Sequence, residues 1–174
     1  MHLHYATGDS QLGKLLVATC GQKLVAVLMG DDLHALVSDL ASRFPQAQMK
    51  EANADLHGLF QQIVKCIDHP HSVHRGLTLE PIGTPFQKRV WAELCHVQPG
   101  TTVTYKKLAE RINAPRAVRA VAGACAANPI AVLIPCHRVV RSDGGLSGYR
   151  WGVERKRVLL QMEAEGSHFS SLRL

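Results

Sequence analysis

Residues 135–140, Pro-Cys-His-Arg-Val-Val, are the stretch from which the rest of the sequence can be interpreted. The apolar run at 130–134 precedes them and predicts a buried strand or extended segment. Pro135 lacks an N–H and restricts the residue before it, so Cys136 is expected at a fixed point after this segment. His137 and Arg138 follow at once and predict a cationic neighbourhood that lowers the pKa of the Cys136 thiol.

A packing role for Cys136 has to be weighed against a chemical one. Cysteine is among the most buried residue types, and a cysteine in an apolar run is more often structural than reactive. However, an ordinary thiol is mostly protonated at pH 7 and needs help to act as a nucleophile. Because an inert core position rarely needs two cationic or titratable neighbours, we interpret Cys136 as a nucleophile.

The Pro135–Val139 motif resembles the active-site signature of the O6-alkylguanine-DNA alkyltransferases. The resemblance covers residues 84–165 almost throughout, is weaker at Ser10–Lys14, and at Ser147–Gly152 points to the Ada-type members of that family. It implies an α+β fold with a small N-terminal sheet-plus-helix domain, ribonuclease H-like, at 1–80. A mostly helical DNA-binding and active-site domain with a helix-turn-helix is expected at 84–174.

The N-terminal half has the pattern of a small sheet with two helices. Three strand-like segments predict antiparallel pairing: 2–6, 14–19 and 24–29. Apolar residues at helical spacing predict one helix from Asp32 to Phe44, before Pro45, and a second from Asp55 to Ile67. Between them we expect a loop at 46–54.

The C-terminal half contains strong helix-start signals. Thr84, Pro85 and Gln87 form a capping box with proline at the first helical position, and Thr104 can cap the next helix. The tight turn at 113–116 leads into a helix at 117–127, and the two short helices predict a helix-turn-helix. The last helix is expected from Val153 to Glu165, with Gly166 as its end.

Charge is distributed unevenly and indicates a polyanionic partner. Residues 1–83 hold six Lys/Arg and eight Asp/Glu, a net charge of −2, whereas residues 84–174 hold fourteen and six, a net charge of +8. The helix at 117–127 begins near Arg116 and Arg119 and is otherwise built of small residues that read few base edges. This composition favours sequence-independent docking in the minor groove of duplex DNA over operator recognition. Charge alone does not decide between DNA binding and a basic face that is merely solvated. The small residues at 117–127 are likewise compatible with a helix packed in a core.

Composition excludes several classes of protein. The sequence has no apolar stretch long enough to cross a membrane and no signal peptide. Its five cysteines are an odd number without paired spacing, so we expect reduced thiols. We also expect a cytoplasmic location, with the nucleoid DNA of a bacterium.

Some family members bind structural zinc. Here Cys20 matches one ligand, but Met1 and Val25 take the places of others, so we expect no metal and no cofactor.

The resemblance implies a role for each residue that matches the family pattern. Cys136 is the nucleophile, His137 its base through a water, and Glu163 the residue that orients His137. Among the implied substrate contacts, Tyr105 crowds the phosphate and binds guanine, and Asn128 is a hinge. The carbonyl of Val139 faces the exocyclic amine, Tyr149 forms a pocket wall, and the N–H of Arg150 faces O6. Among the implied DNA contacts, Arg119 is the arginine finger, whose side chain fills the gap left by the flipped base. Arg116, Lys106 and Lys107 contact phosphates.

The implied activity is single-turnover repair. The alkyl group of O6-alkylguanine in duplex DNA, and also of O4-alkylthymine, would move irreversibly to Cys136 of a monomer. Three other classes of protein fit the sequence less well. An alkyltransferase-like protein that only binds the lesion lacks the cysteine that is present here; a Cys-His hydrolase needs an oxyanion loop that nothing indicates; and a helix-turn-helix regulator needs base-reading side chains that 117–127 lack.

Overall fold

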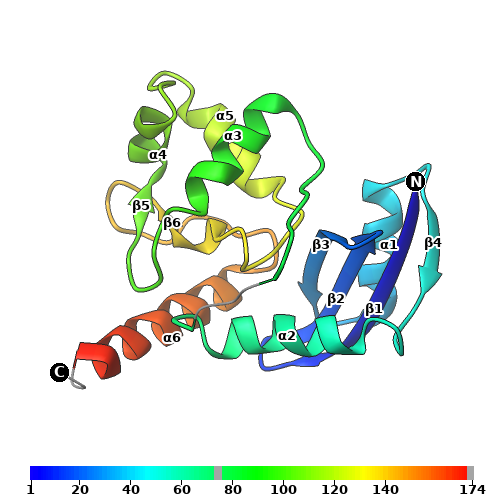
Figure 1. Cartoon of the computed structure of the whole chain (residues 1–174). Helices are drawn as coiled ribbons and strands as arrows, with labels where there is room; N and C mark the ends of the chain where they lie inside the picture. Colours follow the sequence, from blue (N-terminus) through cyan, green and yellow to red (C-terminus); the bar gives the residue numbers. More distant parts are fainter. Residues whose placement is uncertain (73–75, 172–174) are drawn as a thin grey trace. The chain divides into compact units, whose positions relative to one another are not determined.

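The computed structural model describes residues 1–72 and 76–171, with side chains up to residue 166. It divides into two units (Figure 1): the first contains residues 1–68, 76–82 and 129–131, and the second contains residues 69–72, 83–128 and 132–171. The first unit holds a sheet with two helices and the second is mostly helical, so the predicted α+β class is confirmed. No helix within the described ranges is both long and apolar enough to span a membrane.

The first unit is built on a four-stranded sheet with the order β3-β2-β1-β4. Its strands are β1 (His2–Ser10), β2 (Gly13–Cys20), β3 (Lys23–Gly30) and β4 (Gln48–Glu51). The first three are antiparallel neighbours as predicted, but β4 pairs in parallel with β1, so the loop expected at 46–54 is wrong. β4 is mostly exposed and lacks an apolar pattern. Main-chain hydrogen bonds hold it, such as that from Gln48 N–H to Met1 O at 2.9 Å, and these leave no signal in the sequence.

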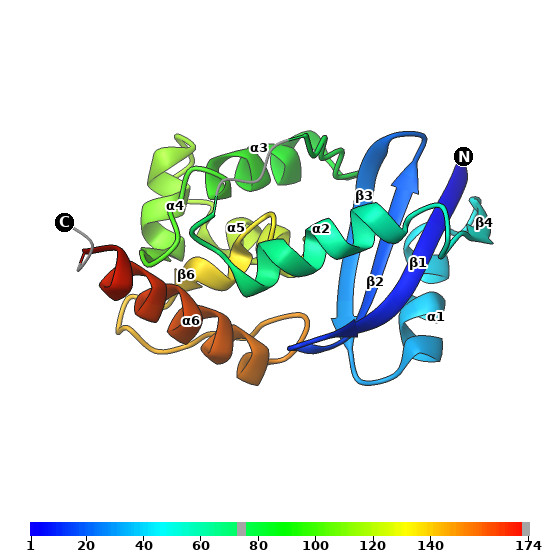
Figure 2. The ribbon, with the colours of Figure 1, turned by 60° about the horizontal axis from the view of Figure 1, so that its bottom comes forward.

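Two helices cover opposite faces of this sheet. They are α1 (Leu33–Arg43) and α2 (His57–Asp68). A Cβ added at Gly8 would touch α2, whereas one added at Gly30 would touch α1. Gly8 pairs with Leu15, and Leu15 pairs with Met29, so these three residues face the same side of the sheet. Gly30 is the next residue on β3 and therefore faces the opposite side. Figure 2 shows the two helices on these sides. The central strands are therefore buried on both faces.

The described part of the second unit contains four α-helices, and the first two of them begin at the predicted caps. They are α3 (Pro85–Leu94), α4 (Tyr105–Arg111), α5 (Val118–Ala126) and α6 (Val153–Ser171). Thr84 Oγ1 accepts from the N–H of Gln87 at 3.1 Å, and Gln87 Oε1 accepts from the N–H of Thr84 at 2.9 Å. Thr104 Oγ1 likewise accepts from the N–H of Lys107. α4 and α5 pack together across residues 112–117 and form the expected helix-turn-helix.

A two-stranded parallel pairing fixes the active segment in this unit. Its strands are β5 (Val103–Thr104) and β6 (Val139–Val140). The short 3-10 helix η1 (Cys136–Arg138) lies immediately before β6, and Tyr105 lies immediately after β5. The pairing places β6, which follows η1, directly beside β5, which precedes Tyr105.

Residues 130–134 do not form the predicted strand. Ile130 makes one bridge with Val27, and turns follow at 131–133. Val132 has a φ of 68°, a left-handed conformation that is unusual for a β-branched residue and ends extended geometry there. Since the run is almost entirely buried, its apolar sequence reflects burial and not strand pairing.

Gly166 does not end α6, which continues to Ser171. A glycine inside a helix costs only about 1 kcal/mol relative to alanine, too little to stop a long helix. A Cβ at Gly166 would collide with the ring of His71, so the absence of a side chain here serves packing.

Candidate active site

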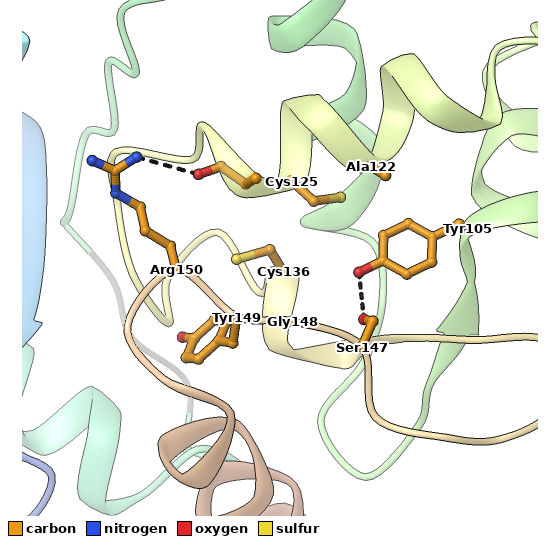
Figure 3. A pocket seen from close by; sticks show the side chains of 9 residues that line it. Tyr105, Ala122, Cys125, Cys136, Ser147, Gly148, Tyr149 and Arg150 are labelled. Atoms are coloured by element: carbon orange, nitrogen blue, oxygen red, sulfur yellow. Dashed lines mark hydrogen bonds between the residues drawn. The ribbon is translucent and has the colours of Figure 1, made fainter.

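Cys136 lies on the wall of a cavity of about 460 Å³ (Figure 3). Its side chain is almost completely buried, with 4% exposed. The lining comes from α4, α5, η1 and the loop before α6: Tyr105, Ala122, Cys125, Ala126, Cys136, Ser147, Gly148, Tyr149 and Arg150. This volume falls in the range of small-molecule sites, about 300–1,000 Å³.

Asn128 connects the end of α5 to the nucleophile. Its Nδ2 donates to the carbonyl of Ile134 at 2.8 Å and to Sγ of Cys136 at 3.2 Å. Asn128 is fully buried, so its orientation is set by these bonds and by packing. The predicted hinge residue thus links the end of α5 to the segment of Cys136 and also contacts the sulfur, although its role in catalysis stays a prediction.

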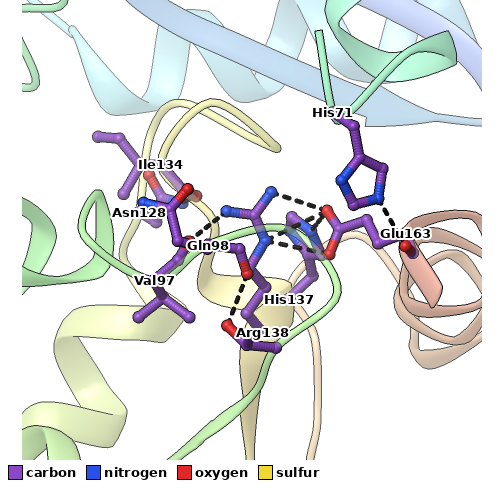
Figure 4. Close-up of polar contacts among 9 residues, drawn as sticks. His71, Val97, Gln98, Asn128, Ile134, His137, Arg138 and Glu163 are labelled. Atoms are coloured by element: carbon purple, nitrogen blue, oxygen red, sulfur yellow. Dashed lines mark hydrogen bonds and ion pairs between the residues drawn. The ribbon is translucent and has the colours of Figure 1, made fainter. Parts of the chain in front are cut away.

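Glu163 lies between His137 and Arg138, and all three side chains are buried (Figure 4). Oε1 of Glu163 is 2.7 Å from Nε2 of His137. Arg138 donates to both carboxylate oxygens, with Nη2 2.8 Å from Oε1 and Nε 3.0 Å from Oε2, and its Nη1 donates to Val97 O at 2.5 Å. Burial alone raises the pKa of Glu163, but the hydrogen bonds and charges of His137 and Arg138 outweigh it and hold the pKa at about 2.

These contacts determine the protonation state of His137. Burial lowers its pKa, and the charges of Arg138 and Lys156 lower it further, although Glu163 partly opposes this shift. The imidazole is therefore neutral at pH 7. Because ionised Glu163 can only accept, Nε2 of His137 carries the proton and Nδ1 has a free lone pair. Nδ1 is buried and has no hydrogen-bond partner in the described part of the chain. His137 is thus arranged as a proton acceptor.

The predicted lowering of the Cys136 pKa is wrong. Burial raises the pKa of this thiol to about 11, and the Asn128 hydrogen bond and the charge of Lys156 offset only part of the shift. The flanking residues do not supply the expected positive field, since His137 is neutral and Arg138 is paired with Glu163. The resting site therefore holds a protonated thiol next to a neutral base.

Sequence reasoning missed Lys156, which is fully buried. Its Nζ donates to Val139 O at 2.6 Å and to Ser147 Oγ at 2.9 Å, and Ser147 Oγ is 2.5 Å from the hydroxyl of Tyr105. One signal was available. Lys156 and Glu163 are seven residues apart, so they share one face of α6.

The other predicted pocket residues are placed as follows. Tyr149 lines the cavity and packs edge-on against Trp151, with ring centroids 5.3 Å apart. Arg150 lines it too, and its Nη1 donates to Ala126 O at 3.4 Å. The carbonyl of Val139 already accepts from Lys156, which leaves one lone pair for a substrate. Their contacts with substrate stay predictions.

The predicted DNA-binding residues all lie on the exposed surface of the helix-turn-helix. They are Lys106, Lys107, Arg116 and Arg119. α5 buries Val121, Ala124 and Cys125, and its exposed face carries small residues three apart, at Ala120, Gly123 and Ala126. No group of three or more His, Cys, Asp or Glu side chains in the described residues is arranged to hold a metal ion.

Both units match models of one protein family. Residues 85–165 match the model described as 6-O-methylguanine DNA methyltransferase, DNA binding domain, and residues 3–69 match 6-O-methylguanine DNA methyltransferase, ribonuclease-like domain. Among solved structures, the chain is similar to the O6-methylguanine methyltransferase of Mycobacterium tuberculosis. The TM-score is 0.77 and the identity 33%, with 94% of this chain and 93% of that one covered. The OGT of the same organism in complex with DNA gives a TM-score of 0.76 at 33% identity, covering 94% of each chain.

Curated relatives give the same result. The chain is 49% identical over 166 residues to the bifunctional transcriptional activator/DNA repair enzyme Ada of Escherichia coli. The alignment covers 94% of this chain but only 46% of that protein's length. It is 38% identical over 163 residues to the methylated-DNA–protein-cysteine methyltransferase of Methanosarcina barkeri, covering 92% of this chain and 97% of the relative. With both units matched and a relative aligned over nearly its full length, the chain belongs to the methylated-DNA–protein-cysteine methyltransferase family.

Proposed function

We propose that this protein repairs DNA by transferring the alkyl group of O6-alkylguanine to Sγ of Cys136. The observation that carries the proposal is the pairing of a buried thiol on a cavity wall with a neutral, oriented histidine next to it in the chain. O4-alkylthymine presents the same leaving-group chemistry and is proposed as a second substrate.

The first step is removal of the thiol proton. With a pKa of about 11, Cys136 needs a base at pH 7, and Nδ1 of His137 has the free lone pair to accept its proton through one bridging water. Glu163 then faces an imidazolium and stabilises it over 2.7 Å, while Arg138 keeps the carboxylate in place. Asn128 and Lys156 favour the charge that develops on the sulfur.

The second step is displacement at the alkyl carbon. The sulfur forms a bond to that carbon, the bond from the carbon to O6 breaks, and its electron pair stays with the guanine. The product is a thioether, which no ordinary reductant or thiol reverses. Each molecule therefore acts once.

We propose that α5 docks in the minor groove and that the target base is extruded into the cavity. A base stacked in a duplex cannot reach a buried sulfur, and extrusion costs a few kcal/mol. Arg119 is exposed near the start of α5 and is suited to fill the gap. The small exposed residues of α5 allow close approach and read little sequence, while Arg116, Lys106 and Lys107 bind phosphates. One chain supplies every part, so a monomer suffices, and we place its action on chromosomal DNA in the cytoplasm.

A labelled duplex tests this function directly. The protein is mixed with DNA carrying one O6-methylguanine with a tritiated methyl group, and the denatured protein is analysed for label. Label on the Cys136 peptide, limited to one methyl per molecule and lost in Cys136→Ser but kept in Cys95→Ser, is expected. Cys95 is an exposed cysteine outside the cavity and provides the matched control. Binding without label, repeated turnover, or label surviving Cys136→Ser contradicts the proposal.

A further inference from the structure

A second cysteine lines the cavity that holds Cys136. Cys125, in the last turn of α5, and Cys136, at the start of η1, both contribute to the cavity wall (Figure 3). The other cysteines of the chain lie outside this lining: Cys20, Cys66 and Cys95. Two thiols therefore face one space, and the function proposed above uses only one of them.

Asn128 connects the two cysteines directly. Its backbone N–H donates to the carbonyl of Cys125 at 3.3 Å, and its Nδ2 donates to Sγ of Cys136 at 3.2 Å. The wall next to Cys125 is formed by the small residues Ala122 and Ala126, which leave its sulfur room to rotate about the Cα–Cβ bond. The fold thus holds both thiols at one end of α5, with space between them for a small group.

The charge on one sulfur affects the other. Burial raises the pKa of the Cys125 thiol to about 12 and a negative charge on Cys136 adds to this rise, whereas the charge of Lys156 lowers it. An alkylated Cys136 is a neutral thioether and cannot carry that negative charge. Cys125 is therefore easier to ionise beside an alkylated Cys136 than beside its thiolate, because the charge of Lys156 then acts without that opposition.

This pair of thiols suits an alkyl group that carries a second leaving group. Transfer of such a group to Cys136 brings a second electrophilic carbon into the cavity that Cys125 lines. Well-oriented groups within one molecule react at effective concentrations of about 10⁵ M or more. Attack by Cys125 is therefore expected to be faster than attack by water or by the bound DNA.

We propose that Cys125 is a second nucleophile, which captures the far carbon of a 2-haloethyl group that Cys136 has taken from O6-(2-haloethyl)guanine. The inference rests on the proposed function, which supplies the first step. In the second step, Sγ of Cys125 bonds to the far carbon, and the halide leaves with the electron pair of the carbon–halogen bond. The thiol proton of Cys125 passes to bulk water. The product is an ethylene bridge between the two sulfurs, which confines the second electrophile to the protein.

The bridge has a direct signature because both cysteines lie in one tryptic peptide, residues 120–138. The protein is reacted with a duplex carrying one freshly prepared O6-(2-chloroethyl)guanine, then denatured, treated with iodoacetamide and digested. We expect this peptide to carry one ethylene group and no iodoacetamide adduct. A duplex with O6-ethylguanine is the matched substrate and should leave an ethyl group on Cys136 and a free thiol on Cys125. A hydroxyethyl group on Cys136 beside a free Cys125 overturns the proposal.

Removal of the second thiol tests what happens to the group without it. In Cys125→Ser the bridge should be absent, and covalent linkage of Cys136 to DNA, measured on a denaturing gel, should increase about tenfold or more. Cys95→Ser, at an exposed cysteine outside the cavity, should keep the bridge. Urea unfolding verifies that the variants are folded, and Cys125→Ala provides a second replacement. An equal level of linkage to DNA with and without Cys125 contradicts the capture.

A second haloethyl donor separates failure of this inference from failure of the proposed function. 1-Bromo-2-chloroethane delivers the same group to the thiols without DNA. If this reagent forms the bridge while the chloroethyl lesion adds nothing to Cys136, the proposed function fails although the two thiols react as a pair. If Cys136 accepts the group from DNA but neither donor produces a bridge, only the role of Cys125 fails.

Discussion

Nδ2 of Asn128 donates a hydrogen bond to Sγ of Cys136 over 3.2 Å, and both residues are buried. The same amide holds the carbonyl of Ile134, so one side chain joins the end of α5 to the segment of the nucleophile. A thioether sulfur is a weak acceptor and carries an extra methyl group. Alkylation of Cys136 must therefore disturb Asn128, and with it the end of the helix proposed to contact DNA.

We expect the methylated protein to be less stable than the unmodified one. A buried amide that loses its acceptor costs about 1–3 kcal/mol. Overpacking adds about 1–3 kcal/mol where the methyl group cannot use the cavity. Urea unfolding of both forms, each verified by mass, measures the difference. In Asn128→Ala the difference should shrink, because the donor is already gone. Equal or higher stability after methylation rules the idea out.

The reactivity of Cys136 should rise with pH to a midpoint near 11. Burial raises the pKa of this thiol to about 11, so little thiolate exists at pH 7 without substrate. Iodoacetamide labelling from pH 7 to 12, followed peptide by peptide, gives the midpoint. The raised pKa also makes folding stability fall as pH increases from 9 through 11, because the unfolded thiol ionises first. A Cys136 midpoint below pH 8.5 contradicts the buried, protonated thiol.

Glu163→Gln should impair both stability and transfer. Removing the carboxylate leaves the buried guanidinium of Arg138 without its ionic partner, at a cost of about 3–5 kcal/mol. It also removes the charge that stabilises protonated His137, so transfer should slow by about 10²-fold or more, as for loss of a general base in His137→Phe. Glu165→Gln, at an exposed carboxylate on the same helix, is the matched control.

The pH dependence of stability provides an independent check on the same carboxylate. The pKa of Glu163 is held at about 2, below its ordinary value of 4.5. A depressed folded-state pKa gives stability that is complete above pH 4.5 and is lost as pH falls toward 2. Glu163→Gln should therefore lose less stability than the unchanged protein over this range. Parallel curves for the two proteins would refute the assignment.

Cys136 and His137 could be anticipated because they stand side by side in one short motif, whereas Glu163 was implied only by the resemblance to the family. The capped starts of α3 and α4 could be predicted for the same reason, since each depends on residues within one turn. The strand β4 could not, because backbone pairing with β1 fixes it. The strand predicted at 130–134 is wrong because burial produces an apolar pattern in a turn as well as in a strand.

The electrostatics of the site were harder to predict than its residues. His137 and Arg138 next to Cys136 suggested a lowered thiol pKa, but their charges are controlled by Glu163, which is distant in sequence. The cation that does act on the sulfur is Lys156, twenty positions later in the chain. The local sequence motif therefore identified the nucleophile but not the charges that act on it. Those charges depend on how α6 packs beside η1.

Arg119→Ala should slow repair of duplex DNA far more than reaction with free O6-methylguanine base. The inserted side chain offsets the unstacking cost of a few kcal/mol, which the free base does not incur. Single-turnover rates on the two substrates provide the comparison. Arg116→Ala, three residues earlier in the turn before α5, is the matched variant and should mainly reduce the salt dependence of binding. Equal losses on both substrates in Arg119→Ala would contradict the finger role.

Gly123→Leu tests whether the exposed face of α5 enters the minor groove. A Cβ at Gly123 meets no atom within 4 Å, so a larger side chain fits the free protein. Replacing a helical glycine should even stabilise the fold by about 0.5–1 kcal/mol. In a groove about 6 Å wide, however, leucine should hold the helix away from the bases and weaken DNA binding.

The matched control is Gly58→Leu on α2, where an added Cβ also meets no atom within 4 Å. Both variants should unfold at equal or higher urea concentration than the unchanged protein. Only Gly123→Leu should bind unmodified duplex more weakly in a fluorescence anisotropy titration, while Cys136 keeps its reactivity toward iodomethane. Since folding and the thiol are then intact, the loss must come from the surface of α5. Unchanged DNA binding by Gly123→Leu would instead place the DNA on another face of the helix-turn-helix.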